Sequence, residues 1–227
     1  MQAAHVALGA SFTEIGTETG EWRVPVAYGA PPEEEVRRAR AGVGLADASA
    51  CGKIEVRGDQ VPALLAKPGG LTALPAGSAR RAGLGGADVL AARLAPDQLL
   101  VLTRPADTAT VTRLLAEAVD GLGCGHLWDL SAGFAAVDLV GPHVPRLLAR
   151  LVPLDLDAIP PLGVVQAGLA RVPAILIRLD RPGLPLVRAL VGREHGAFVW
   201  EALTEAGHDL GLVPVGATAR ALLDGGV

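Results

Sequence analysis

The chain has 227 residues, of which 50% are hydrophobic and only 3% aromatic, and its formal net charge is −4. This length allows one large domain or two small fused ones and is ample for burying a core. The acidic balance, without a basic stripe interleaved with aromatic residues, argues against nucleic-acid binding. The two cysteines have no metal-ligand spacing, and no apolar run approaches the ~20 residues of a membrane span. Neither a zinc site nor a membrane segment is therefore expected.

The N-terminal part has no basic region followed by an apolar core, so the expected location is cytoplasmic. Residues 1–30 predict a short irregular segment with an extended core at 22–29. Two prolines then introduce a helix at 33–40, whose first turn is acidic and whose last turn is basic, as the helix macrodipole favours. The five histidines never fall two on one helix face, so no metal site is expected.

Two segments with the same order of patterns follow, and we interpret them as copies of one module. Module one, at about 45–123, is predicted as strand 52–57, helix 59–67, loop 68–86, strands 87–94 and 98–103, and helix 105–120. Module two, at about 127–211, is predicted as strand 133–140, helix 142–151, loop 153–163, strands 164–169, 172–179 and 185–191, and helix 193–206. This mixture predicts mixed sheets of an α/β (α+β) fold rather than a purely parallel one. No long linker separates the modules, so residues 1–227 are expected to form a single body.

Each module opens with a similar short motif, Asp47-Ala-Ser49 in the first and Asp129-Leu-Ser131 in the second, 82 residues later. Because the serine recurs at the repeat spacing, we predict that Asp or Ser hydrogen-bonds the turn that begins each module. A doubled module of this kind places a functional site where its two copies face each other.

Few residues point to chemistry by themselves. The glycines at 83–86 fit a tight strand turn better than a phosphate cradle, because no GxGxxG or GK[ST] pattern is present. Cys124 and His126 could form a nucleophile pair, but a small buried cysteine beside a surface histidine is the simpler interpretation. Asp88 stands at the mouth of an apolar strand, where partial desolvation would suit an acid/base or amine-binding group. A surface turn aspartate is the alternative.

Four motifs spread along the chain carry a family resemblance. They are Gly-Glu-Trp-Arg-Val-Pro-Val-Ala-Tyr-Gly at 20–29, Gly-Ala-Asp-Val-Leu at 86–90, Val-Asp-Leu-Val-Gly-Pro at 137–142, and Pro-Val-Gly-Ala-Thr-Ala-Arg at 214–220. In this order they resemble the aminomethyltransferases, the T-proteins of the glycine cleavage system. The second half, through 129–133, 153–156 and 169–173, also resembles the gamma subunit of heterotetrameric sarcosine oxidase.

The resemblance implies two pseudo-repeated modules packed around a central channel for tetrahydrofolate. It implies that Asp88 is the catalytic carboxylate, which holds a small cationic amine and promotes one-carbon transfer to a folate nitrogen. It further implies that Arg220 helps to hold the cofactor. Tyr28 matches a motif tyrosine that either contacts the cofactor or packs the N-terminal loop.

Three departures from the family pattern leave alternatives open. Leu184 stands where the family has the glutamate that grips the pterin ring, and an unpaired buried donor costs about 1–3 kcal/mol. The tyrosine-containing segment before the glycines is reduced to Arg-Ala-Gly-Leu at 81–84, and the C-terminal β-rich domain of full T-proteins is expected to be lacking. The alternatives are a non-catalytic gamma-type subunit that partners an oxidase, and a repurposed member that binds another small molecule.

Overall fold

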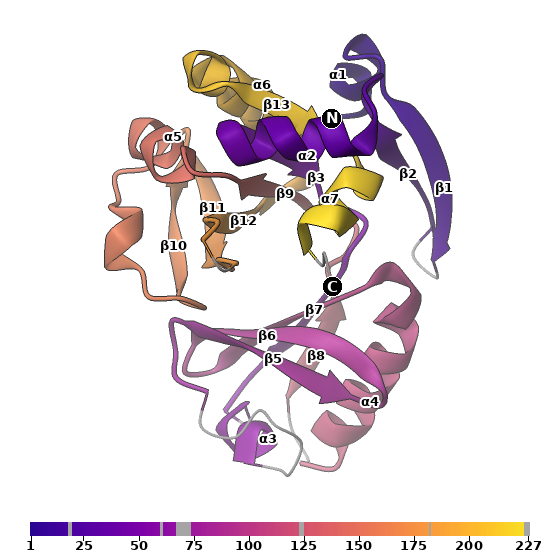
Figure 1. Ribbon diagram of the computed structural model, residues 1–227. Helices are drawn as coiled ribbons and strands as arrows, with labels where there is room; N and C mark the ends of the chain where they lie inside the picture. Colours follow the sequence, from indigo (N-terminus) through magenta and orange to yellow (C-terminus); the bar gives the residue numbers. More distant parts are fainter. Residues whose placement is uncertain (18–19, 60, 67–73, 123–124, 182, 225–227) are drawn as a thin grey trace.

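The computed structural model describes residues 1–17, 20–59, 61–66, 74–122, 125–181 and 183–224, and two β-sheets form its centre (Figure 1). The six-stranded sheet contains, in order of neighbours, β10 (Val164–Leu169), β11 (Val172–Arg178), β12 (Leu186–Gly192), β9 (Phe134–Val140), β3 (Val43–Asp47) and β13 (Leu212–Val215). The five-stranded sheet contains β5 (Ser78–Leu84), β6 (Ala87–Ala95), β7 (Gln98–Thr103), β4 (Gly52–Arg57) and β8 (His126–Asp129). Neighbours are antiparallel except for the parallel pair β13 and β3.

Helices cover these sheets, and a hairpin stands beside them. The hairpin strands are β1 (Ser11–Thr17) and β2 (Gly20–Ala27). The α-helices are α1 (Gln2–Ala7), α2 (Pro32–Ala41), α3 (Val61–Ala66), α4 (Thr108–Asp120), α5 (Val144–Leu151), α6 (Gly196–Gly207) and α7 (Ala217–Asp224). Short 3₁₀ turns are η1 (Pro105–Asp107), η2 (Leu156–Ala158), η3 (Arg193–His195) and η4 (His208–Leu210).

The alternation of side chains along the strands divides the apolar residues into three cores. Along β9, Val137 and Leu139 pack in one core with α5 and α6. Ala136 and Val140 point to the opposite face and pack in the core between the two sheets. A third core lies between the five-stranded sheet and helices α3 and α4. Asp138 belongs to the same row of β9 as Ala136, so the strand carries a carboxylate into the space between the sheets.

The two sheets repeat one strand pattern. The order β5-β6-β7-β4-β8 corresponds strand by strand to β10-β11-β12-β9-β3. The hairpins β5–β6 and β10–β11 both turn through two residues with positive φ, Gly85 and Gly86 in the first and Ala170 and Arg171 in the second. The repeat predicted from the sequence is therefore a repeat of backbone structure.

The opening strands of the two halves are exchanged. β3 comes before β4 in the chain but pairs with β9 in the six-stranded sheet, and β8 comes before β9 but pairs with β4 in the five-stranded sheet. The predicted modules at 45–123 and 127–211 therefore do not coincide with the two sheets. Both exchanged strands are short and carry little periodicity, and the sequence predicts no strand at either place.

The turns that follow the exchanged strands are built alike. The Asp47 carboxylate accepts a hydrogen bond from the Ser49 backbone N–H at 2.8 Å, and the Asp129 carboxylate accepts one from the Ser131 N–H at 2.8 Å. A side chain that accepts a hydrogen bond from the backbone N–H two residues later stabilises a turn without the need for a backbone–backbone hydrogen bond. They confirm the structural role predicted for the two motifs.

The two serines then bond to the opposite half. Ser49 Oγ accepts from the Ala136 N–H at 3.1 Å in β9, and Ser131 Oγ accepts from the Lys53 N–H at 3.0 Å in β4. The buried Lys53 ammonium donates to the carbonyls of Ser49 (2.7 Å), Cys51 (2.9 Å) and Ser131 (3.2 Å). One cation thus ties both turns together, and its burial lowers the pKa of Lys53.

Most predicted elements of the two modules are present, with ends shifted by a few residues, but several elements were not predicted. The expected loop at 68–86 contains β5, an edge strand whose Ser-Ala-Arg-Arg-Ala-Gly-Leu sequence has too few apolar residues to reveal it. The expected irregular segment at 1–30 contains α1 and the β1–β2 hairpin. Strand β13 and helix α7 were also missed.

Lys53→Met should lower the free energy of unfolding by about 3 kcal/mol or more, because three buried carbonyls lose their shared donor while the side-chain volume is nearly kept. The measurement is urea denaturation at pH 7. The matched control is Arg113→Met, which removes an exposed cation of α4 that bonds Glu117 and should change stability little. An equal effect of the two substitutions would contradict the role given to Lys53.

Candidate functional site

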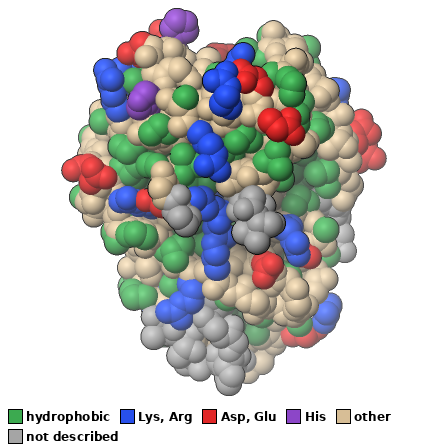
Figure 2. Space-filling view, viewed as in Figure 1, with side chains coloured by type: hydrophobic (Ala, Val, Ile, Leu, Met, Phe, Trp, Pro, Cys, Tyr) green, Lys and Arg blue, Asp and Glu red, His purple; other side chains and the backbone are tan. Residues whose placement is uncertain are grey.

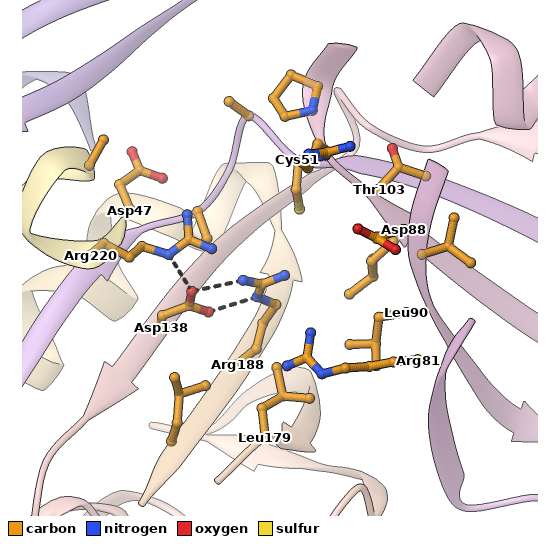
Figure 3. Close-up of a pocket in the computed structure, with 18 of the residues that line it drawn as sticks. Asp47, Cys51, Arg81, Asp88, Leu90, Thr103, Asp138, Leu179, Arg188 and Arg220 are labelled. Atoms are coloured by element: carbon orange, nitrogen blue, oxygen red, sulfur yellow. Dashed lines mark hydrogen bonds and ion pairs between the residues drawn. The ribbon is translucent and has the colours of Figure 1, made fainter. Parts of the chain in front are cut away.

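A cavity of about 710 Å³ opens between the two sheets, which is a size suited to an organic ligand. The β1–β2 hairpin contributes Ile15 and Val24 to its wall. The five-stranded sheet contributes the region around Asp88, and the six-stranded sheet and α7 contribute the region around Asp138 and Arg220 (Figure 3). The cavity therefore lies where the two halves of the repeat face each other.

Asp138 is held by two arginines inside this cavity (Figure 3). Arg188 Nε donates to Asp138 Oδ1 at 2.7 Å and Arg188 Nη2 to Oδ2 at 2.8 Å, while Arg220 Nε donates to Oδ2 at 2.8 Å. Burial by itself would raise the pKa of Asp138, but the charges and hydrogen bonds of Arg188 and Arg220 outweigh burial and hold it well below 3.8. The cluster of one carboxylate and two guanidinium groups keeps a net positive charge at neutral pH.

The rest of the cavity wall is also rich in cations. Five arginines and three aspartates line it: Arg81, Arg104, Arg181, Arg188, Arg220, Asp47, Asp88 and Asp138. Lys and Arg side chains also gather across the middle of the face shown in Figure 2. A wall with this excess of guanidinium groups favours a ligand that carries an anionic group, because arginine binds carboxylate and phosphate in a two-pronged geometry.

Asp88 lies on the wall of this cavity, near the start of β6 and beside the β5–β6 turn. Its side chain is exposed, so the partial desolvation expected from its place in the sequence is not found. The hydrogen bond and charge of Asp107 raise the pKa of Arg104, and the charge of Asp88 adds a smaller contribution in the same direction. In Figure 3, Asp88 and Arg188 reach toward the same space from opposite walls. An exposed carboxylate there can hold a cation without the cost of burying a charge.

The structure brings Arg220 but not Tyr28 to this cavity. Arg220 lies in α7 and lines the wall. The Tyr28 hydroxyl instead bonds His5 Nδ1 at 2.8 Å, and its backbone N–H donates to Glu35 at 2.7 Å. Burial, reinforced by the charges of Asp47 and Glu35, raises the pKa of Tyr28. Because His5 Nε2 lies 3.0 Å from Asp47 Oδ2, Tyr28 reaches the cavity wall only through His5 and Asp47.

Leu184 is 8% exposed and packs in the core between the sheets, outside the residues that line the cavity. The nearby Asp180 carboxylate does not replace the glutamate expected there. It accepts from Arg178 Nε at 2.6 Å and from the Leu186 N–H at 3.1 Å. The described residues at 179–186 therefore offer no uncommitted carboxylate in the place of the pterin grip.

The other motifs considered from the sequence have structural roles or cannot be placed. Gly85 and Gly86 form the β5–β6 turn with φ of 59° and 85°, so the glycine cluster closes a hairpin as predicted. Cys124 lies outside the described residues. The ring of His126 stacks on Trp128 with centroids 5.3 Å apart, on the edge strand β8.

Sequence reasoning missed Asp138 and Arg188, although a signal for them is present. Each interrupts an apolar strand, in Phe-Ala-Ala-Val-Asp-Leu-Val at 134–140 and Leu-Val-Arg-Ala-Leu-Val-Gly at 186–192. A single acid and a single base in two buried strands predict an ion pair if the strands are neighbours. The pairing of β9 with β12, which brings Asp138 opposite Arg188, could not be read from the sequence.

The GCVT N-terminal domain family matches residues 1–224 of this chain. An aminomethyltransferase of Streptomyces coelicolor (strain ATCC BAA-471 / A3(2) / M145) is 32% identical over 228 residues, covering 97% of this chain and 60% of that protein. The sarcosine oxidase subunit alpha of Corynebacterium sp. (strain P-1) is 28% identical over 237 residues, covering 95% of this chain and 24% of that protein.

Two solved structures share the fold. The glycine cleavage system aminomethyltransferase T from Bartonella henselae has a TM-score of 0.82 at 20% identity, covering 96% of this chain and 59% of that one. A chain of the heterotetrameric sarcosine oxidase from Corynebacterium sp. U-96 has a TM-score of 0.63 at 22% identity, covering 81% of this chain and 94% of that one. These matches confirm the predicted mixed α/β fold of the T-protein type. The chain spans about three-fifths of the length of the aminomethyltransferases that it matches.

Within the described part of the chain, no helix has both the length and the apolar character that crossing a membrane requires.

Asp138→Asn should lower the free energy of unfolding at pH 7 by about 3–5 kcal/mol, because two arginines lose their buried counter-charge. The folded-state pKa of Asp138 is depressed, so its stabilisation is complete above 3.8 and is lost as the pH falls through the lower folded value. The difference in unfolding free energy between the unaltered protein and Asp138→Asn should therefore narrow below pH 3.8. Urea denaturation between pH 7 and pH 3 measures it.

The control for this prediction is Asp209→Asn, which removes the carboxylate of an exposed ion pair with Arg150. Exposed pairs contribute little, so this change should leave stability nearly unaltered at pH 7. If the difference in unfolding free energy between Asp138→Asn and the unaltered protein stayed constant from pH 7 to pH 3, it would contradict the negative charge assigned to Asp138.

Proposed function

The chain belongs to the GCVT N-terminal domain family, and we propose that it binds tetrahydrofolate in the cavity between its sheets and handles a small amine or one-carbon unit there. The observation that carries the proposal is the meeting of Asp88 and Arg220 on the wall of one cavity, although Asp88 lies in strand β6 and Arg220 in helix α7. The names of the aminomethyltransferase relatives support the class of reaction.

The wall of the cavity fits the parts of a folate. Apolar side chains from both sheets, Leu90 and Leu102 on one side and Leu179 and Leu186 on the other, offer flat contact for a ring system. The surplus of arginines suits the carboxylates of the glutamate end. The poor fit is at the pterin edge, since the described residues at 179–186 offer no uncommitted carboxylate to accept its N–H groups, and a weaker grip on that edge follows from the proposal.

Asp88 and Arg220 take different parts in the proposed reaction. The Asp88 carboxylate holds the ammonium of the amine substrate and can accept its proton when the nitrogen must become neutral. Arg220 uses Nε for Asp138, so its two Nη groups remain to donate to a carboxylate of the ligand. Asp138 and Arg188 fix the direction of the Arg220 side chain and act through it. When bound, tetrahydrofolate supplies the nitrogens that accept the one-carbon unit.

A second candidate function rests on a different observation. The sarcosine oxidase subunit alpha of Corynebacterium sp. (strain P-1) is similar to this chain, and a chain of heterotetrameric sarcosine oxidase shares its fold. Together with Leu184 in the place of the glutamate that grips the pterin ring, these matches favour a subunit of an oxidase-like assembly without catalysis of its own. Such a subunit would bind a partner protein stably, and co-purification with a flavin oxidase would support it.

Tetrahydrofolate should bind the purified chain with measurable heat, and Arg220→Met should weaken that binding about 10- to 100-fold, since one charge-assisted hydrogen bond is worth about 1.5–3 kcal/mol. Isothermal titration calorimetry measures both. Arg150→Met, on α5 and away from the cavity, is the matched control and should bind like the unaltered chain. No heat and no thermal shift at millimolar tetrahydrofolate would rule out the folate proposal and favour the subunit.

Asp88→Asn should abolish turnover of tetrahydrofolate with an aminomethyl donor while changing folate affinity less than about threefold, because the amide keeps the shape but loses the charge that holds the amine. The exposed position predicts an unchanged melting temperature. Turnover, affinity and melting should be measured on one preparation. Retained turnover would remove Asp88 from the reaction.

A further inference from the structure

A second cavity, of about 530 Å³, lies between the same two sheets. The repeat of the fold relates it to the first. In the first cavity, Gly83 and Asp88 face each other beside the β5–β6 turn, and in the second Gly168 and Pro173 face each other beside the β10–β11 turn. Almost every residue that lines the second cavity corresponds in strand register to one that lines the first. The second cavity is thus the counterpart of the first in the other half of the repeat.

The correspondence extends to a carboxylate in the middle of each cavity. In the first, β12 pairs with β9 so that Arg188 stands opposite Asp138. In the second, β7 pairs with β4 so that Leu100 stands opposite Glu55. Glu55 therefore corresponds to Asp138, and Leu100 to Arg188. The second cavity keeps the acid but has an apolar side chain in the place of its guanidinium partner.

Glu55 has a neutral partner in place of that cation. Gln98 Nε2 donates to Glu55 Oε1 at 2.5 Å, and Glu55 is only half-buried. Among the described residues, the one arginine that lines this cavity is Arg171, which sits exposed in the β10–β11 turn and stays solvated. Because its partner Gln98 is neutral, the Glu55 carboxylate can still form a charge-assisted hydrogen bond with a cation.

The remaining wall of the second cavity is much less charged than that of the first. Gln166 stands where the first cavity has Arg81, and Pro173 where it has Asp88. The apolar wall is formed by Leu94, Leu100, Leu130, Phe134, Ile175 and Leu190. Such a wall favours binding of an apolar ligand body, because it removes that body from water.

We propose that the second cavity binds an organic ammonium ion with an apolar body. The ammonium takes the place beside Glu55 that the guanidinium of Arg188 takes beside Asp138, and the apolar body packs against the leucines, Phe134 and Ile175. The selectivity follows from the wall: an anion of the same shape meets the Glu55 carboxylate, and a neutral isostere leaves the carboxylate without its counter-charge. This site is independent of folate binding in the first cavity.

The probe for this proposal is 2-phenylethylammonium, compared with the neutral 2-phenylethanol and the anionic 3-phenylpropionate, by calorimetry on the full chain. The ammonium should bind at least about tenfold more tightly than the alcohol, and the anion more weakly still. Glu55→Gln should remove the preference for the ammonium. Asp88→Asn, which alters one carboxylate of the first cavity, should leave this preference intact.

Leu100→Arg supplies a second test, because it rebuilds in the second cavity the acid–guanidinium pair of the first. It should abolish ammonium binding while the fold, followed by circular dichroism, is kept; if this variant does not fold, Glu55→Gln decides alone. Equal affinity for ammonium and alcohol, an unaltered preference in Glu55→Gln, or loss of binding in Asp88→Asn in place of Glu55→Gln would each overturn the proposal.

Discussion

The exchange of β3 and β8 is the constraint on which the rest of the fold depends. Each half contributes one strand to the sheet of the other, and Ser49 and Ser131 bond the receiving strands directly. The Lys53 ammonium then closes the crossing by joining carbonyls from both turns. These bonds are buried, so each one lost leaves a polar group without water or partner. The crossing therefore ties the two sheets together, and its turns reach both cavities, through Ala48 and Cys51 in the first and Leu130 in the second.

The pairing of the strands explains why charged side chains lie in the interior. Between the sheets, strands present one row of side chains to each other, and in most places these are leucine, alanine and valine. Asp138 and Arg188 interrupt that row as cross-strand partners, and Arg220 reaches them from α7. A buried pair of this kind adds little net stability, because desolvation offsets attraction. Its effect is to hold the guanidinium groups of Arg188 and Arg220 in fixed positions on the wall of a cavity that a ligand can enter.

The sequence predicts the elements that depend on local patterns, but it does not predict which strands pair when they lie far apart in the chain. Strands formed by nearly continuous apolar runs, such as β7 and β11, and the long helices α4 and α6 were predicted, and the repeat of Asp47 and Asp129 was assigned its structural role. The motifs led to Asp88 and Arg220, which the structure places on one cavity wall. Tyr28 belongs to the same motif set but is bonded to His5. The exchange itself, the Asp138–Arg188 pair and the second cavity depend on which strands are neighbours, and no local pattern encodes that.

The two corresponding hairpin turns, β5–β6 and β10–β11, differ in the cost of their backbone conformation. The β5–β6 turn contains Gly85 and Gly86, whose positive φ angles cost nothing, whereas the β10–β11 turn contains Ala170 and Arg171 in the same left-handed region. Glycine moves through a wide range of backbone angles, while a residue with Cβ has a narrow well there and holds about 1 kcal/mol of strain. The β10–β11 turn therefore holds backbone strain that the β5–β6 turn avoids, although the two turns occupy the same place in the repeat.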